Sequence, residues 1–429
     1  MEQKIYDEYV RILQEELVPA MGCTEPIAIA YGAAVAARAL GTEPESVEVR
    51  ASANIIKNVK SVVVPCTGGQ RGISAAVCAG IVAADTEKGL EILASMTEEQ
   101  KEQAKKLQSC LPVSVNESRS GYIFDIQIKA SAGGHSGYAQ IAGYHTNVIC
   151  VKKDEKVMQE KPYVEQKQSF GTDRELLTVE RIADFAECVE ISHVEEVLER
   201  QIAYNTAIAQ EGMRGSFGAQ IGKILLECYG DNVQNRAKAI AAAGSDARMN
   251  GCELPVIINS GSGNQGMTAS LPVIVYGEEL QVPRETLLRA LVVSNLVTIH
   301  LKTGIGRLSA YCGAISAGCG AGAGICYLYG GRAYEISHVI VNAVAINSGV
   351  ICDGAKASCA AKIASAVEAG LLGVQMQRKN MEFHDGEGII RKGVENTIRN
   401  IGELASQGMR ETDRTIIRMM TQEGNTGLR

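Results

Sequence analysis

The feature that most constrains the fold of this chain is a run of small residues between Arg307 and Lys362. It opens with RLSAYCGAISAGCGAGAGICYLYGG and closes with ICDGAKASCAAKI. Small side chains let two backbones approach closely. The whole chain has 45 Gly, 5 Phe and no Trp, so small and aliphatic side chains should make up most of its core. We therefore expect helices packed against helices, with a core of Ala, Val, Ile and Leu.

Three cysteines in this run are candidate metal ligands. Cys312, Cys352 and Cys359 lie among small residues, which leave room for a bulky inorganic centre near the backbone. Thiolates are the ligands that soft metals and iron-sulfur clusters prefer. The alternative is that a buried cysteine acts as a small hydrophobic residue, which we expect of Cys319 and Cys326. No CxxC pair occurs in the run, so the spacing alone is a weak ligand signal.

The same run contains an apolar segment, Ala310 to Leu328, of nearly the length of a membrane span. Small polar residues interrupt it and no second span exists in the sequence. A buried core helix is the better interpretation.

Bulk properties restrict the kind of partner. A chain of 429 residues is long enough for two or three domains. Its net charge of -7 and pI of about 5.6 give no basis for binding nucleic acid or an anionic membrane. Its 13 cysteines without a signal peptide indicate a reducing compartment, so we expect a cytoplasmic protein. We also expect a homo-oligomer whose partner is a small-molecule substrate.

A fourth cysteine precedes a predicted helix near the N-terminus. Cys23 is followed by Thr24, Glu25 and Pro26, an order typical of a helix start. The amides and dipole of a helix start lower the pKa of a thiol and attract anions. A lone cysteine is usually structural, but this position favours a role as a ligand or an acid-base group.

The next segment predicts an anion-binding turn. VEVRASANIIKNV and SVVVPCTGG are typical of strands, and the first carries Asn54. The second opens into Thr67, Gly68 and Gly69 before a helix, and a strand followed by a glycine turn and a helix can bind a carboxylate through backbone amides. The alternative is an ordinary strand-to-helix turn.

Two further polar sites stand out. Alternating residues over 122 to 160 predict an antiparallel sheet, and His145 lies at a strand end beside Thr146. A lone histidine is more often a structural hydrogen-bonding group than a catalyst. The loop predicted from Asn259 to Gly266 contains Ser262 and Asn264, and its polar backbone suits a ligand.

These elements predict an α+β protein. Residues 1–42 and 176–429 should form a mostly helical, cluster-binding catalytic domain. Residues 43–175 should form a smaller strand-rich α/β domain with antiparallel strands, inserted near the N-terminus.

Several motifs together resemble a known family. GCTEPIAIAYGAA, SANIIKNVKSVVVPCTGG, HTNVI, NSGSGNQGM, LSAYCGA and ICDGAKASC look like the L-cysteine desulfidases, which are similar to the α-chain of iron-sulfur L-serine dehydratases. The resemblance implies a carbon-sulfur lyase of cysteine catabolism that uses no pyridoxal phosphate. It implies an oxygen-sensitive 4Fe-4S cluster and conversion of L-cysteine to pyruvate, ammonia and hydrogen sulfide.

The resemblance implies a cluster role for Cys312, Cys352 and Cys359, and it places Cys23 in the GCTEP motif. The related serine dehydratases use three cysteines and leave one iron open to substrate, so Cys23 is either a fourth ligand or an acid-base group. We expect Cys23 to lie near the other three. Cys66 is given no function.

Removal of the α-proton needs a base, and the candidates are Cys23, Lys57 and His145. We expect one substrate pocket beside the cluster. Its predicted lining is Asn54, Thr67, Gly68, Gly69, His145, Thr146, Ser262 and Asn264.

Three alternatives remain from sequence. The same chemistry could act on L-serine. A pyridoxal-phosphate lyase is suggested by SGSGNQG, although a tetraglycine phosphate loop is missing from the sequence. A non-enzymatic metal or sulfur sensor would not need the polar loops.

Overall fold

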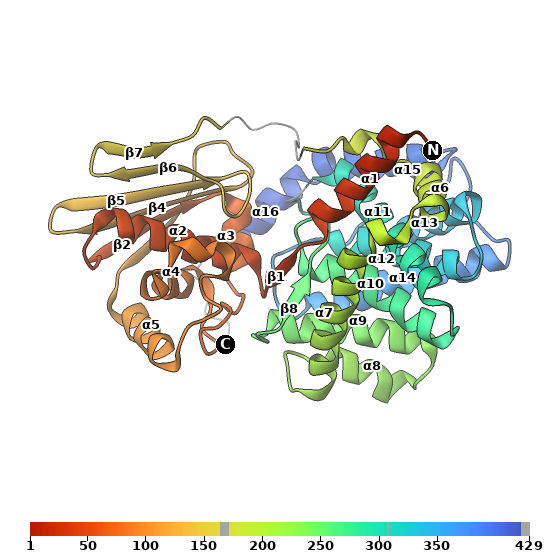
Figure 1. Cartoon of the computed structure of the whole chain (residues 1–429), viewed down its shortest axis with the longest axis horizontal. Coiled ribbons are helices and arrows are strands. Elements are labelled where there is room, and N and C mark those ends of the chain that lie inside the picture. Colours follow the sequence, from red (N-terminus) through yellow and green to blue (C-terminus); the bar gives the residue numbers. More distant parts are fainter. Residues whose placement is uncertain (164–170, 307–308, 422–429) are drawn as a thin grey trace. The chain divides into compact units, whose positions relative to one another are not determined.

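The computed structural model describes residues 1–163, 171–306 and 309–421. Arg307 and Leu308, which begin the run of small residues, lie outside the described residues, as do residues 164–170 near the end of the smaller predicted domain. The chain forms two compact units (Figure 1). Unit 1 comprises Met1–Ala20, Gln168–Cys352 and Ala357–Arg410, and unit 2 comprises Met21–Lys167, Asp353–Lys356 and Glu411–Arg429.

Unit 2 is built on a six-stranded sheet of order β3-β2-β4-β5-β6-β7. Strands β2 and β3 pair in parallel and the other neighbours are antiparallel, so the sheet is mixed, whereas the sequence predicted antiparallel strands. The presence of this sheet confirms the α+β class. The strands are β2 (Ser46–Ala51), β3 (Val113–Glu117), β4 (Asp125–Ala132), β5 (His135–Ala142), β6 (Val148–Lys153) and β7 (Lys156–Glu160).

Helices cover one face of this sheet. Helix α2 lies so close to β5 that a Cβ on Gly137 would stand 2.1 Å from the Ala36 carbonyl oxygen. Gly80 of α4 also packs closely on α2, since a Cβ on Gly80 would lie 2.0 Å from the Ala30 carbonyl oxygen. The helical segments of unit 2 are α2 (Thr24–Leu40), α3 (Ala53–Val59), α4 (Gly72–Ala83), η1 (Thr86–Glu91), α5 (Glu98–Cys110) and most of α16 (Arg410–Thr421).

Two strand predictions in unit 2 were wrong. The segment SANIIKN, expected to continue a strand, forms helix α3, because Ile55, Ile56 and Val59 fall on one buried helical face. The β-branched run before Thr67 makes a single bridge between Val63 and Arg71 instead of a strand. The chain turns back at once after this run, which leaves no length for a ladder.

Unit 1 is almost entirely helical. Its described helical segments are α1 (Gln3–Glu16), η2 (Arg174–Leu176), α6 (Val179–Cys188), η3 (Ile191–His193), α7 (Glu195–Arg214), α8 (Ile221–Tyr229), α9 (Val233–Met249), α10 (Gly263–Glu279), α11 (Arg284–Ile305), α12 (Gly313–Leu328), α13 (Ala333–Asn347), α14 (Cys359–Arg378), α15 (Val394–Glu403) and η4 (Leu404–Gly408). Short strands are β1 (Pro19–Met21) and β8 (Pro255–Ile257).

Helix α12 is the centre of unit 1. Every residue from Ala314 to Tyr327 is buried, which confirms a core helix. Its glycines meet neighbouring helices: a Cβ on Gly318 would lie 2.3 Å from the Ala366 oxygen of α14, and one on Gly320 would lie 2.2 Å from Thr298 of α11. Among the described residues no helix is both long and apolar enough to cross a membrane.

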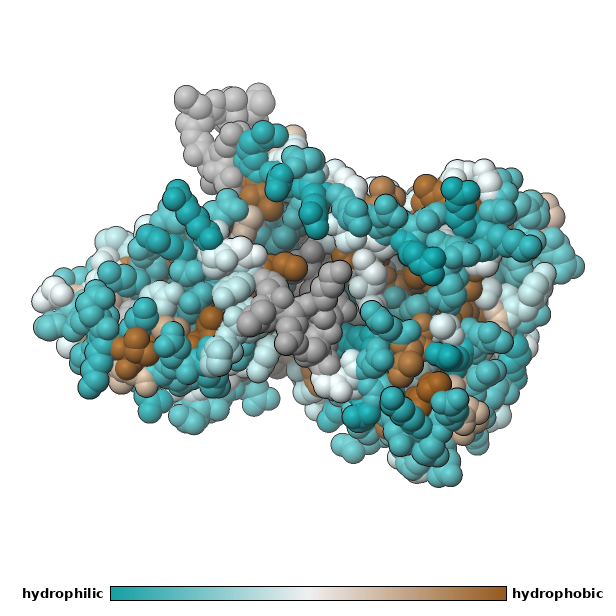
Figure 2. Space-filling view, turned by 90° about the horizontal axis from the view of Figure 1, so that it is seen from above, coloured by the Kyte–Doolittle hydropathy of each residue, from teal (hydrophilic) through white to brown (hydrophobic). Residues whose placement is uncertain are grey.

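The surface is mostly hydrophilic on the face shown in Figure 2. Hydrophobic residues form small separate groups there. The described residues therefore form no extended apolar patch on this face.

Candidate functional site

Unit 1 brings together the three cysteines that the sequence singled out. Tyr311 and Ile351 form an antiparallel bridge. Across it the Cys312 amide donates to the Val350 oxygen at 3.0 Å, and the Cys352 amide donates to the Ala310 oxygen at 2.6 Å. Cys312 is the N-cap of α12.

Cys359 opens helix α14 and completes this group. A thiolate at Cys352 or Cys359 would disfavour ionisation of Cys312, so the three thiols are near enough to interact electrostatically. Burial, together with the neighbouring sulfurs of Cys352 and Cys359, raises the pKa of Cys312 to about 12. The Ala314 amide and the Lys362 ammonium oppose the shift. A bound metal would reverse this preference, because a coordinating thiol is deprotonated.

The three thiols suit an iron-sulfur cluster better than a single metal ion. Among the described residues no three His, Cys, Asp or Glu side chains converge tightly enough to hold one metal ion. A four-iron cluster differs from a single ion because each cysteine binds a different iron, so the thiols surround a volume instead of meeting at a point. The sulfur donor set, its partial burial and the small neighbours fit such a cluster.

The second element of unit 1 is the turn before helix α10. The predicted loop from Asn259 to Gly266 is shorter than expected, because α10 already begins at Gly263. Asn259 and Ser262 exchange two backbone hydrogen bonds, of 3.1 and 3.0 Å. The two residues between them both have positive φ, +50° at Ser260 and +79° at Gly261, as in a type I′ turn.

Buried amide side chains hold this turn in place. Asn259 donates to the Asn295 side chain of α11 at 3.0 Å, and Asn295 donates to Gln201 of α7 at 2.8 Å. Asn205 of α7 accepts from the Ile257 amide at 2.9 Å. All four side chains are fully buried, so this network fixes where α10 begins.

A buried arginine lies against the start of α10. Arg248 of α9 is only 5% exposed and donates to the Asn264 side chain at 3.1 Å. Its Nε atom is buried and has no partner among the described residues. Gly263 makes room for it, because a Cβ there would lie 2.4 Å from Nε. Helix α10 also lacks a side-chain cap at Ser262, so its first amides remain available to an anion.

Gln265 links this helix start to the cysteine group. It is 6% exposed, and its Oε1 has no partner among the described residues. A Cβ on Gly313, the residue after Cys312, would lie 2.6 Å from the Gln265 amide carbon. The uncapped start of α10 therefore adjoins the start of α12, where Cys312 lies.

The sequence reasoning missed Arg248 and Gln265. The usable signal was the pair of charges, Asp246 and Arg248, inside the alanine-rich segment AKAIAAAGSDARMNG. A charged side chain is almost never fully buried unless it is paired. A charge in a buried, alanine-rich helix therefore indicates a partner or a ligand.

Unit 2 carries the remaining predicted residues. Cys23 is the N-cap of α2 and is 4% exposed. Its thiol donates to Glu25 Oε2 at 3.1 Å, and Asn58 donates to the other Glu25 oxygen at 3.0 Å. A carboxylate is therefore positioned to accept the Cys23 proton.

The predicted anion turn lies beside this cysteine. Gly22 packs on Pro65, since a Cβ there would lie 2.3 Å from the proline ring. Thr67 is buried and its hydroxyl donates to the Val64 oxygen at 2.7 Å, which closes the turn. Gly68 and Gly69 have φ of +68° and +91°, and a Cβ on either would meet nothing within 4 Å. The turn thus presents open backbone next to the GCTEP motif.

Asn54 and Lys57 both lie on helix α3. The Asn54 side-chain oxygen is buried and has no partner among the described residues. The Lys57 ammonium is buried and forms an ion pair with Asp413 of α16 at 2.6 Å. Gly354 of the ICDGAKASC motif packs on the Lys57 carbonyl, where a Cβ would lie 2.4 Å away.

His145 and Thr146 lie in the turn between β5 and β6, so His145 is not the last residue of a strand. The His145 ring packs edge-on against Phe124, with centroids 4.8 Å apart. The Thr146 methyl lies near Gly89 of η1. The meeting of these unit 2 residues with Ser262, Asn264 and the three cysteines of unit 1 stays a prediction.

Comparisons with known proteins match nearly the whole chain. Residues 87–418 match the family model described as the serine dehydratase alpha chain. A UPF0597 protein of Desulfitobacterium hafniense is 56% identical over 98% of both chains. UPF0597 proteins of Lachnoclostridium phytofermentans and Treponema denticola are 49% and 43% identical, over 97% and 99% of this chain and the full length of each relative.

Proposed function

This chain belongs to the serine dehydratase α-chain family, and from that premise we propose that it is an iron-sulfur-dependent lyase that acts on L-cysteine without pyridoxal phosphate. L-cysteine and water would give pyruvate, ammonia and hydrogen sulfide. The observation that carries the proposal is the group of Cys312 at the start of α12, Cys359 at the start of α14 and Cys352 on the adjoining bridge. The buried arginine site at the start of α10 adjoins this group.

In this proposal Cys312, Cys352 and Cys359 hold a 4Fe-4S cluster. When bound, the cluster would supply a Lewis-acidic iron with an open position toward the substrate. The backbone bridge between Tyr311 and Ile351 fixes the separation of the first two thiols. The start of α14 orients the third.

Arg248 and the first amides of α10 would bind the substrate carboxylate. A buried guanidinium can make two parallel hydrogen bonds to a carboxylate, and helix-start amides add partial positive charge. The buried Arg248 Nε supports this role, because its N–H makes no hydrogen bond among the described residues and can donate to the substrate. Asn264 already accepts from Arg248, which orients the guanidinium.

The α-proton needs an acceptor, and Cys23 is the candidate that the hydrogen bonds favour. Its proton points to Glu25 Oε2, so transfer to Glu25 would leave a thiolate at the start of α2. The Lys57 ammonium is held by Asp413 and must lose a proton before it can accept one. His145 remains the third candidate.

After loss of the α-proton and the sulfur leaving group, the product is aminoacrylate. It becomes an imine by tautomerisation, and water hydrolyses the imine to pyruvate and ammonia. This last step needs no residue of the chain.

L-serine is the second candidate substrate, because the matching family model describes a serine dehydratase. The deciding experiment is anaerobic purification, analysis of iron and acid-labile sulfide, and a pyruvate assay with each amino acid. Sulfide release from L-cysteine with a higher kcat/KM than L-serine supports the proposal. Faster turnover of L-serine supports the alternative, and a sharp aldimine absorbance band would overturn both.

The substrate loops provide a second test. Thr67→Ala and Asn264→Ala should each raise KM or lower kcat and leave the iron content unchanged, since one lies in the unit 2 turn and the other beside Arg248. Unchanged activity in both variants would make these loops structural.

A further inference from the structure

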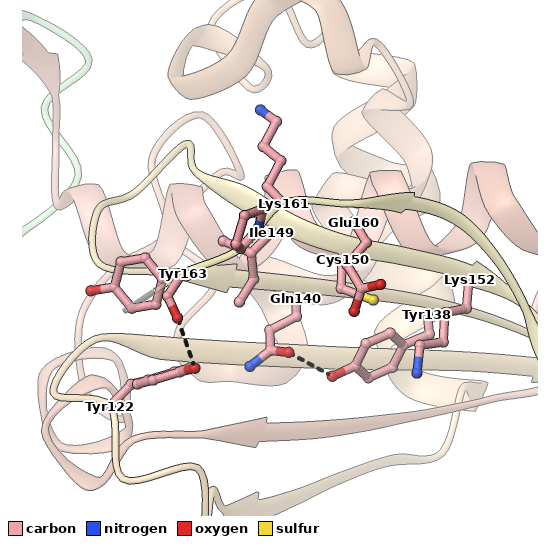
Figure 3. A pocket seen from close by; sticks show the side chains of 10 residues that line it. Tyr122, Tyr138, Gln140, Ile149, Cys150, Lys152, Glu160, Lys161 and Tyr163 are labelled. Carbon is pink, nitrogen blue, oxygen red and sulfur yellow. Dashed lines mark hydrogen bonds between the residues drawn. The ribbon is translucent and has the colours of Figure 1, made fainter. Parts of the chain in front are cut away.

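Unit 2 contains a cavity that the lyase chemistry does not use. It has a volume of about 520 Å³ and lies over β5, β6 and β7 (Figure 3). Gly137 of β5 faces α2, and side chains alternate along a strand, so Tyr138 and Gln140 lie on the other face of the sheet. The cavity therefore opens on the face that α2 leaves uncovered.

A β-bulge shapes the floor of this cavity. Gln140 pairs with Cys150 and Ile141 pairs with Val148, which leaves Ile149 as an extra residue in β6. Ile149 and Cys150 both belong to one buried apolar cluster, against which Tyr122, Tyr138 and Tyr163 pack. Bulges commonly redirect a side chain beside a binding site.

Aromatic rings form the walls. Tyr122 and Tyr163 meet at 87° with centroids 4.9 Å apart, and Tyr138 stands further along β5. Ring faces and edges of this kind favour another planar ring over an aliphatic chain.

The polar atoms of the floor are already paired. The Tyr138 hydroxyl donates to Gln140 Oε1 at 3.3 Å, and Gln140 donates to Asp125 at 2.9 Å. Asp125 is fully buried and also accepts from Ser120 and Gln127, each at 2.7 Å. This network makes the floor rigid, and a ligand need not satisfy it.

One charge of each sign remains at the Tyr138 end of the cavity. The Lys152 ammonium lies 5.7 Å from the Tyr138 ring centroid, and Glu160 lines the same end. In the part of the chain that the structure describes, neither has an ion-pair partner. Figure 3 shows the third charged lining residue, Lys161, with its ammonium directed away from Tyr138 and Gln140.

We propose that this cavity binds a free aromatic α-amino acid. The ligand carboxylate lies at Lys152, its ammonium at Glu160, and its ring against the tyrosines. The volume is within the range of about 300–1,000 Å³ typical of small-molecule sites. L-cysteine or L-serine would leave most of it empty, so this inference does not rest on the proposed lyase activity.

Free L-tryptophan is the probe, because the chain contains no tryptophan and all indole emission comes from the ligand. Titration of the full chain into L-tryptophan should raise its fluorescence anisotropy in a saturable way. Lys152→Met and Glu160→Gln should each weaken binding about tenfold or more. Lys161→Met is the matched control and should bind as the unchanged protein does.

Ligand analogues test the same contacts without changing the protein. Tryptamine lacks the carboxylate and N-acetyl-L-tryptophan lacks the ammonium, so both should bind at least about tenfold more weakly than L-tryptophan. Binding of both analogues as tight as that of L-tryptophan would overturn the proposal. So would an equal loss of affinity in Lys161→Met and Lys152→Met, or no saturable signal at millimolar L-tryptophan. Thermal melts of the three variants verify that they are folded.

Discussion

Two cysteines of this chain occupy the same local position and differ in their surroundings. Cys23 is the N-cap of α2 in unit 2, and Cys312 is the N-cap of α12 in unit 1. Both are buried, and neither caps its helix with a side-chain hydrogen bond. In the sequence, each cysteine directly precedes a helix that is rich in small residues.

The side chains around the two cysteines differ. Cys23 donates to a carboxylate, Glu25, which Asn58 holds in place. Cys312 faces two more thiols, and burial together with those sulfurs raises its pKa to about 12. A thiol beside a carboxylate can exchange a proton, whereas three thiols form a donor set for soft metals. The helix start is common to both sites, so tertiary neighbours determine the chemistry.

The largest expected effect comes from replacing the three cysteines of unit 1. Cys312→Ala, Cys352→Ala and Cys359→Ala should each lose most of the iron and nearly all turnover, because each removes one thiolate from the donor set. Anaerobic iron and acid-labile sulfide analysis measures this. Cys319→Ala is the matched control: it removes a buried thiol of the same helix, and iron should be retained.

Cys23→Ala should keep the cluster and lower kcat by about 10²–10⁴-fold, the usual contribution of a positioned acid-base group. A colourless Cys23→Ala protein together with an iron-replete Cys359→Ala protein would reverse the assignment. Cys23 would then be a permanent ligand and Cys359 would not.

An intermediate effect concerns the arginine beside the cysteine group. Arg248→Lys should lower kcat/KM for the amino acid by about 10–100-fold with iron unchanged, because lysine keeps the charge and loses the paired donors of a guanidinium. Arg236→Lys is the control, since Arg236 lies on the same helix and pairs at the surface with Asp231. Equal losses in both variants would indicate damage to α9 instead of a lost substrate contact.

The sequence predicted those parts of the site that depend on local pattern. The helix start after Cys23 and the buried α12 follow from residue type and spacing. The three cysteines were singled out by their small neighbours and by the family resemblance, because their spacing alone is a weak signal. The resemblance to serine dehydratase α-chains is confirmed by the family match.

Parts that depend on long-range packing could not be predicted. Arg248 reaches α10 only because Gly263 leaves space, and Gln265 reaches α12 only because Gly313 does. Neither glycine differs in sequence from many others in the chain. The strand prediction over Ile55 failed for a related reason: a short apolar run fits a buried helix as well as a strand, and packing decides between them.

The smallest expected effect tests whether Arg248 is free to bind an anion. Asp246 lies two residues earlier on α9 and is 1% exposed. Burial raises its pKa from 3.8 to about 6, and backbone hydrogen bonds from Gly222 and Ile221 oppose the shift. Its Oδ1 has no partner among the described residues. An Asp246 carboxyl that does not pair with Arg248 leaves the Arg248 charge available to substrate.

The sign of the pH dependence follows from that raised pKa. Between about pH 4 and pH 6 the native state binds more protons than the unfolded state, so the free energy of unfolding contributed by Asp246 falls as pH rises. The full cost, of the order of 3 kcal/mol, is present above about pH 6. Asp246→Asn removes this cost and keeps an oxygen that can accept from Gly222. The variant should therefore be more stable than the unchanged protein at pH 8, by about 1–3 kcal/mol, and equally stable at pH 4. Urea unfolding at both pH values measures the difference, with the exposed Asp184→Asn as control. A less stable Asp246→Asn protein at pH 8 would mean that the ionised carboxylate is paired in the native state. If its partner were Arg248, that residue could not be the anchor of the substrate carboxylate.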